Sequence, residues 1–175
     1  MHIPVQTPPD SLEDKPWIGP KYEETRILVL GESWYGDWGG AQNSDAGYVQ
    51  AYIDGILADR MYTKIANATG MDRKTYWNSI AFTNLVIWAG AKRTDRPTPQ
   101  MYRSSIPRLR GLLQQLKPRG VWILGKEQAE HSAPVIKQAG IPFDISIHPT
   151  GYGVTRFELS ESWRKLTTAL AAEAT

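Results

Sequence analysis

The chain alternates short apolar runs with longer segments of helical periodicity, and this alternation constrains its fold more than any other feature. The apolar runs cover residues 26–30, 79–88, 121–124 and 143–147, and the helical segments cover residues 48–68, 99–116, 126–138 and 160–172. Short runs rich in β-branched residues are typical of strands buried on both faces of a parallel sheet. Strands that alternate with helices predict an α/β fold. We therefore expect a three-layer α/β/α architecture around a central four-stranded, mostly parallel sheet.

The placement of proline divides the chain into an arm and one domain. Five prolines within residues 1–20 disfavour regular helix, so this stretch is predicted to form an extended N-terminal arm on the surface. The remaining residues, 21–175, have the length of a single domain. We expect them to form one α/β domain.

The absence of cysteine excludes several kinds of site. A chain without cysteine forms no disulfide, carries no thiol nucleophile and offers no thiolate to zinc or to an iron–sulfur cluster. The three histidines are scattered along the sequence, so we expect neither a metal site nor a cofactor.

Hydropathy and charge limit the partners of the chain. No apolar run approaches the roughly 18 residues of a membrane span, and the first residues lack the apolar core of a signal peptide. We therefore expect a cytoplasmic protein without a membrane partner. We also expect a monomer, which no sequence feature decides. The 20 Lys and Arg residues exceed the 18 Asp and Glu residues, which gives a net charge of +2. This mild basicity is compatible with a nucleic-acid partner.

Polar side chains cluster where the predicted strands end. Glu32 and Ser33 follow the first strand, Asn84 lies in the second, and His148 follows the fourth. In open α/β sheets, ligands bind at the carboxyl ends of the strands. A carboxylate, a carboxamide and an imidazole are therefore expected to converge on one edge of the sheet.

Three of these segments resemble motifs of the uracil-DNA glycosylase superfamily. Gly31-Glu32 resembles the start of its first motif, FTNLV at 82–86 resembles the strand with its base-reading Asn, and HPTGYG at 148–153 resembles its second motif. The resemblance spans residues 25–170 and implies the fold of that family and its activity on bases in DNA. Ser33 stands where the most efficient members carry an Asp that helps to activate water. Branches that begin the first motif with Gly-Glu hold an iron–sulfur cluster, so this cysteine-free chain resembles a divergent, cluster-free branch.

The resemblance implies catalytic roles for Glu32 and His148. Cleavage of an N-glycosidic bond passes through an oxocarbenium-like sugar. Glu32 is expected to orient or deprotonate the attacking water, and His148 to donate a hydrogen bond to O2 of the departing base. The alternatives are a carboxylate that caps a helix and a histidine that makes only a structural hydrogen bond in a turn.

Four further residues are expected to contact a flipped base. Asn84 offers a donor and an acceptor to its Watson–Crick edge, with Asn78 as the reserve candidate. Tyr48 is placed like the stacking aromatic of the family, Tyr35 like a ring that crowds the pyrimidine C5 in some members, and Ser33 completes the set. The alternatives are a buried Asn satisfied by the backbone and a Tyr48 that packs only in the core.

The second motif is also expected to contact DNA. Tyr152 stands where many members have a Leu wedge, and its ring can fill the gap left by a flipped nucleotide. Thr150, Gly151 and Arg156 are expected to lie near backbone phosphates, and residues 92–96 form a further basic loop. For each of these cations the alternative is a solvated surface charge.

The sequence therefore predicts a monofunctional DNA glycosylase that flips a deaminated or modified base from single- or double-stranded DNA and leaves an abasic site. The glycine-rich stretch 36–47 leaves room for a base larger than uracil, such as an enlarged modified pyrimidine of phage DNA. Both DNA repair and defence against foreign DNA therefore stay open. The alternative is a non-catalytic DNA-binding protein with the same fold, which Ser33 favours.

Two other enzyme classes fit the sequence poorly. A dinucleotide-binding protein would carry Gly-x-Gly-x-x-Gly after the first strand, where this chain has Gly31-Glu32-Ser33. A serine hydrolase would need a glycine in place of Tyr35.

Overall fold

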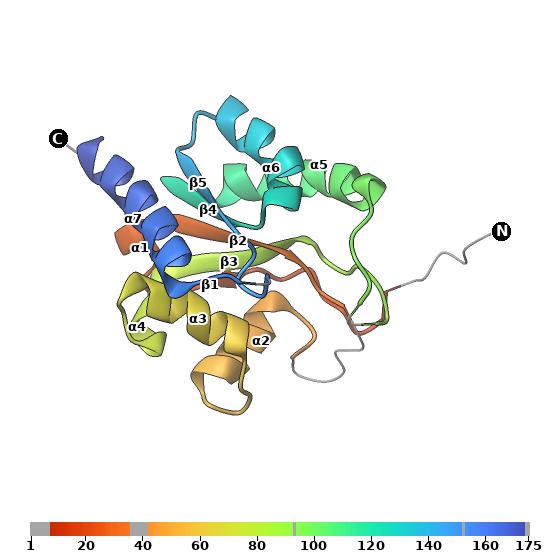
Figure 1. Ribbon diagram of the computed structural model, residues 1–175. Helices are drawn as coiled ribbons and strands as arrows, with labels where there is room; N and C mark the ends of the chain where they lie inside the picture. Colours follow the sequence, from red (N-terminus) through yellow and green to blue (C-terminus); the bar gives the residue numbers. More distant parts are fainter. Residues whose placement is uncertain (1–7, 36–41, 93, 152, 174–175) are drawn as a thin grey trace.

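The computed structural model describes residues 8–35, 42–92, 94–151 and 153–173, and a five-stranded sheet runs through their middle (Figure 1). The strands are β1 (Trp17–Ile18), β2 (Ile27–Ser33), β3 (Ile80–Val86), β4 (Gly120–Leu124) and β5 (Phe143–Ser146). They lie in the order β1-β3-β2-β4-β5. The four longer strands are parallel, and β1 pairs antiparallel with β3 at one edge.

Helices cover both faces of this sheet. They are α1 (Tyr22–Thr25), α2 (Asp45–Ile53), α3 (Arg60–Thr69), α4 (Arg73–Ser79), α5 (Pro99–Leu116), α6 (Lys126–Gln138) and α7 (Arg156–Ala172). In Figure 1, α5 and α6 lie above the sheet, and α2, α3 and α4 lie below it. Among the described helices, none is both long and apolar enough to cross a membrane.

The two faces of the sheet follow from the alternation of side chains along each strand. Leu28 and Leu30 of β2 pack with residues of α5 and α6, whereas Ile27 and Val29 pack with residues of α2, α3, α4 and α7. Successive residues of a strand point to opposite faces, so one apolar run supplies two cores. The predicted three-layer α/β/α fold is confirmed.

The fifth strand corrects the expected count of four and the expected character of the arm. Trp17 is buried, lies opposite Phe82 in the sheet, and donates from Nε1 to the Trp77 carbonyl at 2.7 Å. Residues 17–18 therefore belong to the fold, although residues 8–16 form no helix or strand. A strand of two residues between prolines has no sequence period, which is why the pattern missed it.

The predicted helix at 48–68 is two helices. Ser44 caps α2 and Asp59 caps α3, each by accepting a hydrogen bond from a backbone N–H of the first turn. Residues 54–59 between them leave Ile56 71% exposed, where the periodicity placed it in the core. The chain turns at Gly55, whose φ of 75° suits glycine.

Two other boundaries also differ from the prediction. The unpredicted helix α4 lies directly before β3, with Asp72 as its N-cap. Helix α7 begins at Arg156 and not at Ser160, because Thr155 and Glu158 form a capping box. The Ser160 hydroxyl instead donates to the Ala68 carbonyl at 2.6 Å and ties α7 to α3.

An aromatic cluster fills the layer between the sheet and helices α2, α3 and α4. Tyr62 packs on Trp77 with ring centroids 4.5 Å apart, and both rings contact Phe82 of β3. Tyr52 packs edge-on against Tyr62 and Trp77. Seven of the 175 residues are Trp and eight are Tyr, and this cluster places several of these rings in the core.

Candidate functional site

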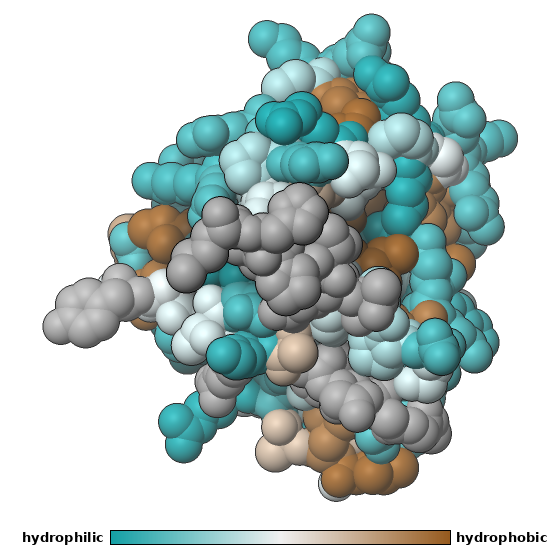
Figure 2. Space-filling model, turned by 90° about the vertical axis from the view of Figure 1, so that its right-hand side faces the viewer, coloured by the Kyte–Doolittle hydropathy of each residue, from teal (hydrophilic) through white to brown (hydrophobic). Residues whose placement is uncertain are grey.

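A pocket of about 510 Å³ lies at the carboxyl ends of β2 and β3. Its lining residues are Ser33, Trp34, Tyr35, Tyr48, Ala58, Asp59, Arg60, Met61, Tyr62, Asn84, His148 and Thr150. The volume falls within the range of roughly 300 to 1,000 Å³ that is usual for small-molecule sites. Figure 2 looks onto this end of the molecule, where the described surface is mostly hydrophilic with separate hydrophobic patches. The structure thus brings together six residues that the sequence predicted to share a site.

Asn84 contributes a carboxamide whose orientation is fixed. It lies opposite Gly31 in the register of β2 and β3, and its Nδ2 donates to Asp45 Oδ1 at 2.8 Å. A carboxylate only accepts hydrogen bonds, so the NH₂ group of the amide must face Asp45. No described residue donates to Asn84 Oδ1, which leaves this oxygen and the second N–H for a ligand in the pocket.

A side chain at position 31 would displace this amide. A Cβ added to Gly31 would overlap Asn84 Oδ1 and lie 3.1 Å from Phe82 Cζ. We expect Gly31→Ala to destabilise the protein by about 1–3 kcal/mol, because overpacking forces neighbours to move. Urea denaturation measures this change. The control is Gly111→Ala in α5, which meets no atom within 4 Å and is expected to be neutral or stabilising. An unchanged stability in Gly31→Ala would contradict this placement of Asn84.

His148 follows β5 in a tight turn that fixes its tautomer. The Thr150 backbone N–H points at His148 Nδ1 at 3.3 Å, and Thr150 Oγ1 lies 2.8 Å from the same nitrogen. Because a backbone N–H can only donate, Nδ1 accepts and the proton of the neutral ring lies on Nε2. The Gly151 N–H closes the turn on the His148 carbonyl at 2.8 Å, and Lys64 Nζ donates to the Pro149 carbonyl at 3.0 Å.

The surroundings of His148 favour the neutral imidazole. Burial lowers the pKa of His148 below its ordinary value, the Glu32 carboxylate opposes this shift, and the Arg96 guanidinium adds to it. At neutral pH the favoured form of His148 is therefore the neutral ring, with its proton on Nε2.

Glu32 does not line the pocket. Its side chain points to the α5 side of the sheet, where Oε1 accepts from the Tyr102 hydroxyl at 3.0 Å and Oε2 from Arg96 at 3.1 Å. It is only 5% exposed. It also caps no helix, because β2 continues through it to Ser33. Glu32 thus lies within electrostatic range of His148 and is held by two donors.

Ser33 brings a buried hydroxyl to the pocket. It is the last residue of β2, lines the pocket, and its buried Oγ makes no hydrogen bond with a described residue. A buried hydroxyl without a partner is costly unless a ligand or a water satisfies it. Its free donor and acceptor are therefore available to a molecule in the pocket.

Aromatic rings form one wall of the pocket. Tyr48 packs edge-on against Trp34 and Tyr62, with ring centroids 5.5 and 5.3 Å away. The Tyr48 hydroxyl donates to Asp59 Oδ2 at 2.9 Å, and burial with that carboxylate raises the pKa of Tyr48. Tyr48 therefore both packs against the core and lines the pocket.

The predicted DNA-contacting residues lie around the turn after β5. Thr150 is exposed and lines the pocket, Gly151 lies in the turn, and Arg156 is exposed at the first position of α7. Tyr152 lies outside the described residues. The reserve candidate Asn78 lies in α4, just before β3 begins, and does not line the pocket.

Sequence reasoning missed two carboxylates of the site. Asp45 lies behind Asn84, and Asp59 lines the pocket while it caps α3. A Ser-Asp pair before a helical segment and an Asp before Arg60 are capping signals, and they were available in the sequence. Neither residue was predicted to belong to the site, because the glycine-rich stretch 36–47 hides the start of α2 and residues 48–68 have the periodicity of one helix.

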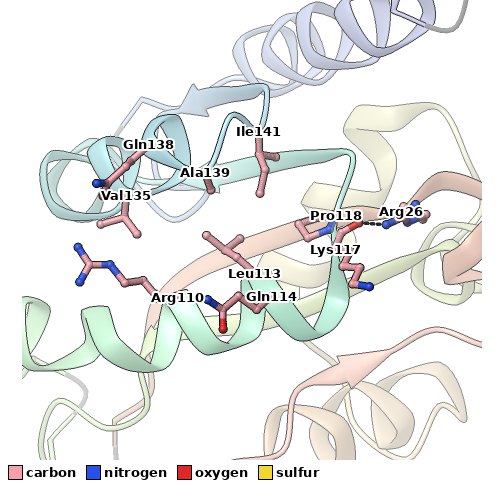
Figure 3. A pocket seen from close by; sticks show the side chains of 10 residues that line it. All are labelled: Arg26, Arg110, Leu113, Gln114, Lys117, Pro118, Val135, Gln138, Ala139 and Ile141. Carbon is pink, nitrogen blue, oxygen red and sulfur yellow. Dashed lines mark hydrogen bonds between the residues drawn. The ribbon is translucent and has the colours of Figure 1, made fainter.

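A second cavity, of about 530 Å³, lies between α5 and α6 near the start of β4 (Figure 3). Three cations, Arg26, Arg110 and Lys117, surround apolar residues such as Leu113 and Val135. The described residues that line it include no carboxylate and no imidazole. This cavity has no group suited to general acid–base chemistry, so the pocket at the strand ends is the stronger candidate.

The last two observations concern metal ligands and similarity to known proteins. Within the described part of the chain, no group of three or more His, Asp or Glu side chains is placed to hold a metal ion. Comparison of the sequence with protein-family models and with curated proteins finds no match.

Proposed function

We propose that this protein is a monofunctional DNA glycosylase of the uracil-DNA glycosylase superfamily. The observation that carries the proposal is the pocket in which the oriented Asn84 amide and the neutral His148 ring meet the aromatic wall of Tyr35 and Tyr48. A planar ligand with polar edges suits such a pocket, and a base flipped out of DNA is one. We propose that it acts in the cytoplasm, as a monomer and without a metal or cofactor.

Cleavage of the N-glycosidic bond requires stabilisation of the negative charge that develops on the departing base. The C1′–N bond breaks, its electron pair goes to the base, and the negative charge spreads to a carbonyl oxygen such as O2 of a pyrimidine. His148 Nε2–H donates to that oxygen and stabilises the anion without giving up its proton. Water then bonds to C1′ and loses a proton to solvent.

Two residues of the first motif would act on the water and on the sugar. The Ser33 hydroxyl holds the water beside the sugar, because its Oγ has no other described partner. Glu32 contributes its negative charge near the oxocarbenium-like sugar, while Tyr102 and Arg96 hold it in place. Because an oxocarbenium ion reacts readily, the water needs a fixed position more than a strong base.

Recognition of the base and of DNA would follow the same geometry. Asn84 reads the Watson–Crick edge, Tyr48 stacks on the base, and Tyr35 crowds its C5 position. Thr150, Gly151 and Arg156 would contact phosphates, and Tyr152 would fill the gap in the stack.

The excision rate is expected to stay constant as the pH falls from about 8 to about 6.5, and to decline only below that. The neutral form of His148 is the donor, and burial lowers its pKa, so the active form persists below the ordinary value of 6.5. Single-turnover rates across this range measure the profile. A rate that rises as the pH falls would instead assign the activity to the imidazolium.

A strand-cleavage assay tests the proposed function. Labelled oligonucleotides would carry uracil, hypoxanthine, xanthine or oxidised pyrimidines, beside phage DNA with enlarged cytosines, and alkali would then cleave abasic sites. We expect cleavage of at least one substrate by the wild type. The second candidate, a non-catalytic DNA-binding protein, is favoured by the absence of a carboxylate at Ser33. DNA binding without cleavage of any substrate would establish that candidate.

A further inference from the structure

A buried carboxylate lies directly behind the base-reading amide. Asp45 is the first residue of α2 and is 9% exposed. Its Oδ2 accepts from Thr83 Oγ1 at 2.7 Å and from the Asn84 backbone N–H at 3.0 Å, and its Oδ1 accepts from Asn84 Nδ2 at 2.8 Å. Three donors from two adjacent residues of β3 therefore converge on one side chain.

The charge of this carboxylate is compensated from the other side of β3. Arg108 of α5 donates to Thr83 Oγ1 at 2.8 Å and to the Asn84 carbonyl at 2.9 Å. Burial raises the pKa of Asp45, and its three hydrogen bonds and the Arg108 charge oppose that rise. Both oxygens of Asp45 face donors, an arrangement that suits the ionised form.

The network continues into the N-terminal segment. Arg108 forms a bidentate ion pair with Asp14, in which Nε donates to Oδ2 at 2.7 Å and Nη2 donates to Oδ1 at 2.6 Å. The Ala46 N–H, next to Asp45, donates to the Lys15 carbonyl at 2.9 Å. The segment around residues 14–15 thus holds both Arg108 and the start of α2.

We propose that Asp45 is a positioning residue that sets which face of the Asn84 amide a ligand meets, with Arg108 and Asp14 as its support. With Nδ2 bound to the carboxylate, the Asn84 amide cannot turn over, so its Oδ1 acceptor and its remaining N–H face a ligand in a fixed order. With Oδ1 opposite the ring nitrogen of the Watson–Crick edge, the site selects a base with a ring N–H there and disfavours one with a ring lone pair. The identity of the ligand as a base rests on the proposed function, whereas the orientation of the amide does not.

Asp45→Asn tests this role at nearly constant volume. An amide at position 45 both accepts and donates hydrogen bonds. The Asn84 amide can therefore rotate by half a turn, so that its oxygen and its NH₂ group exchange places toward a ligand. We expect proton exchange at the Asn84 side-chain NH₂, followed by NMR, to become at least about tenfold faster, because a charge-assisted hydrogen bond is lost. The ratio of uracil to cytosine affinity, measured with the free bases, is expected to fall by at least about tenfold.

Two further variants keep the test falsifiable. Glu161→Gln removes an exposed ion pair with Arg164 on α7 and is the control, with no expected change in either readout. Asp14→Asn is the milder variant should Asp45→Asn fail to fold, and it is expected to shift both readouts in the same direction. Unchanged amide exchange in a folded Asp45→Asn protein would overturn the proposal.

The amide signal separates this inference from the proposed function. If the wild type excises no base, the proposed function fails. Faster proton exchange at the Asn84 side-chain NH₂ in Asp45→Asn would still establish the positioning role. In the opposite case the wild type excises a base, and Asp45→Asn retains both the base selectivity of the wild type and its slow proton exchange at the Asn84 side-chain NH₂. Only the positioning role then fails.

Discussion

Replacement of His148 by Ala is expected to lower the rate of base excision by about 10²–10³-fold, the usual effect of removing one donor that stabilises a developing oxyanion. The wild-type ring is neutral, carries its proton on Nε2, and lines the pocket beside Asn84. Single-turnover kinetics with saturating protein measures the chemical step apart from DNA binding. The loss should therefore appear in the rate constant and not in the affinity for DNA.

The matched variant for this experiment is His148→Gln, which keeps a side-chain donor. It is expected to retain part of the lost activity, because its amide can also donate to the departing base. Equal rates for His148→Ala and the wild type would remove His148 from the mechanism. Thermal unfolding of both variants should stay near that of the wild type, because the turn is also held by Gly151 and Lys64.

Replacement of Trp77 by Ala is expected to destabilise the fold by about 3–5 kcal/mol, as found for large-to-small changes in protein cores. Trp77 is fully buried, packs on Tyr52, Tyr62 and Phe82, and its carbonyl accepts from the Trp17 indole. A loss of this size is a large share of the total stability of a typical domain, about 5–15 kcal/mol. Urea denaturation followed by circular dichroism measures it.

The control for Trp77 is Phe157→Ala in α7, a large apolar residue that is 75% exposed. Its removal should change the free energy of unfolding by no more than about 0.5 kcal/mol. A similar loss in both variants would contradict the packing of the aromatic cluster. Because Tyr62 joins this cluster to the pocket, Trp77→Ala is also expected to lower excision activity.

Elements with clear local signals could be predicted from the sequence, bounds included. Helices α5 and α6 begin and end where the sequence placed them, since Thr98 and Pro99 mark the start of α5 and Gly125 the start of α6. The break between α2 and α3 was missed because apolar residues such as Ile56 continue the helical spacing through an exposed turn. The two-residue strand at Trp17 offers no period at all, and only tertiary pairing with β3 forms it.

The residues of the pocket show the same contrast between features with a local sequence signal and features set by distant contacts. The position of Asn84 and His148 at the strand ends followed from topology, and the structure places both in one pocket. The direction of Glu32 was not recognised, although strand alternation puts it on the face opposite Gly31. The partners of Glu32 and Asn84 come from distant segments, at Tyr102 and Asp45, so local sequence patterns carry no signal for them.

Detection of the released base tests the central claim most directly. The purified protein would be incubated with the oligonucleotides described above, and the masses of the released small molecule and of the DNA would be measured by mass spectrometry. A glycosylase predicts an intact free base together with DNA that has lost that base and gained one hydroxyl group at C1′, and it predicts that both products are strongly reduced with His148→Ala. Intact DNA with every substrate, or release of a nucleoside or nucleotide in place of a free base, would contradict hydrolysis of the N-glycosidic bond by this protein.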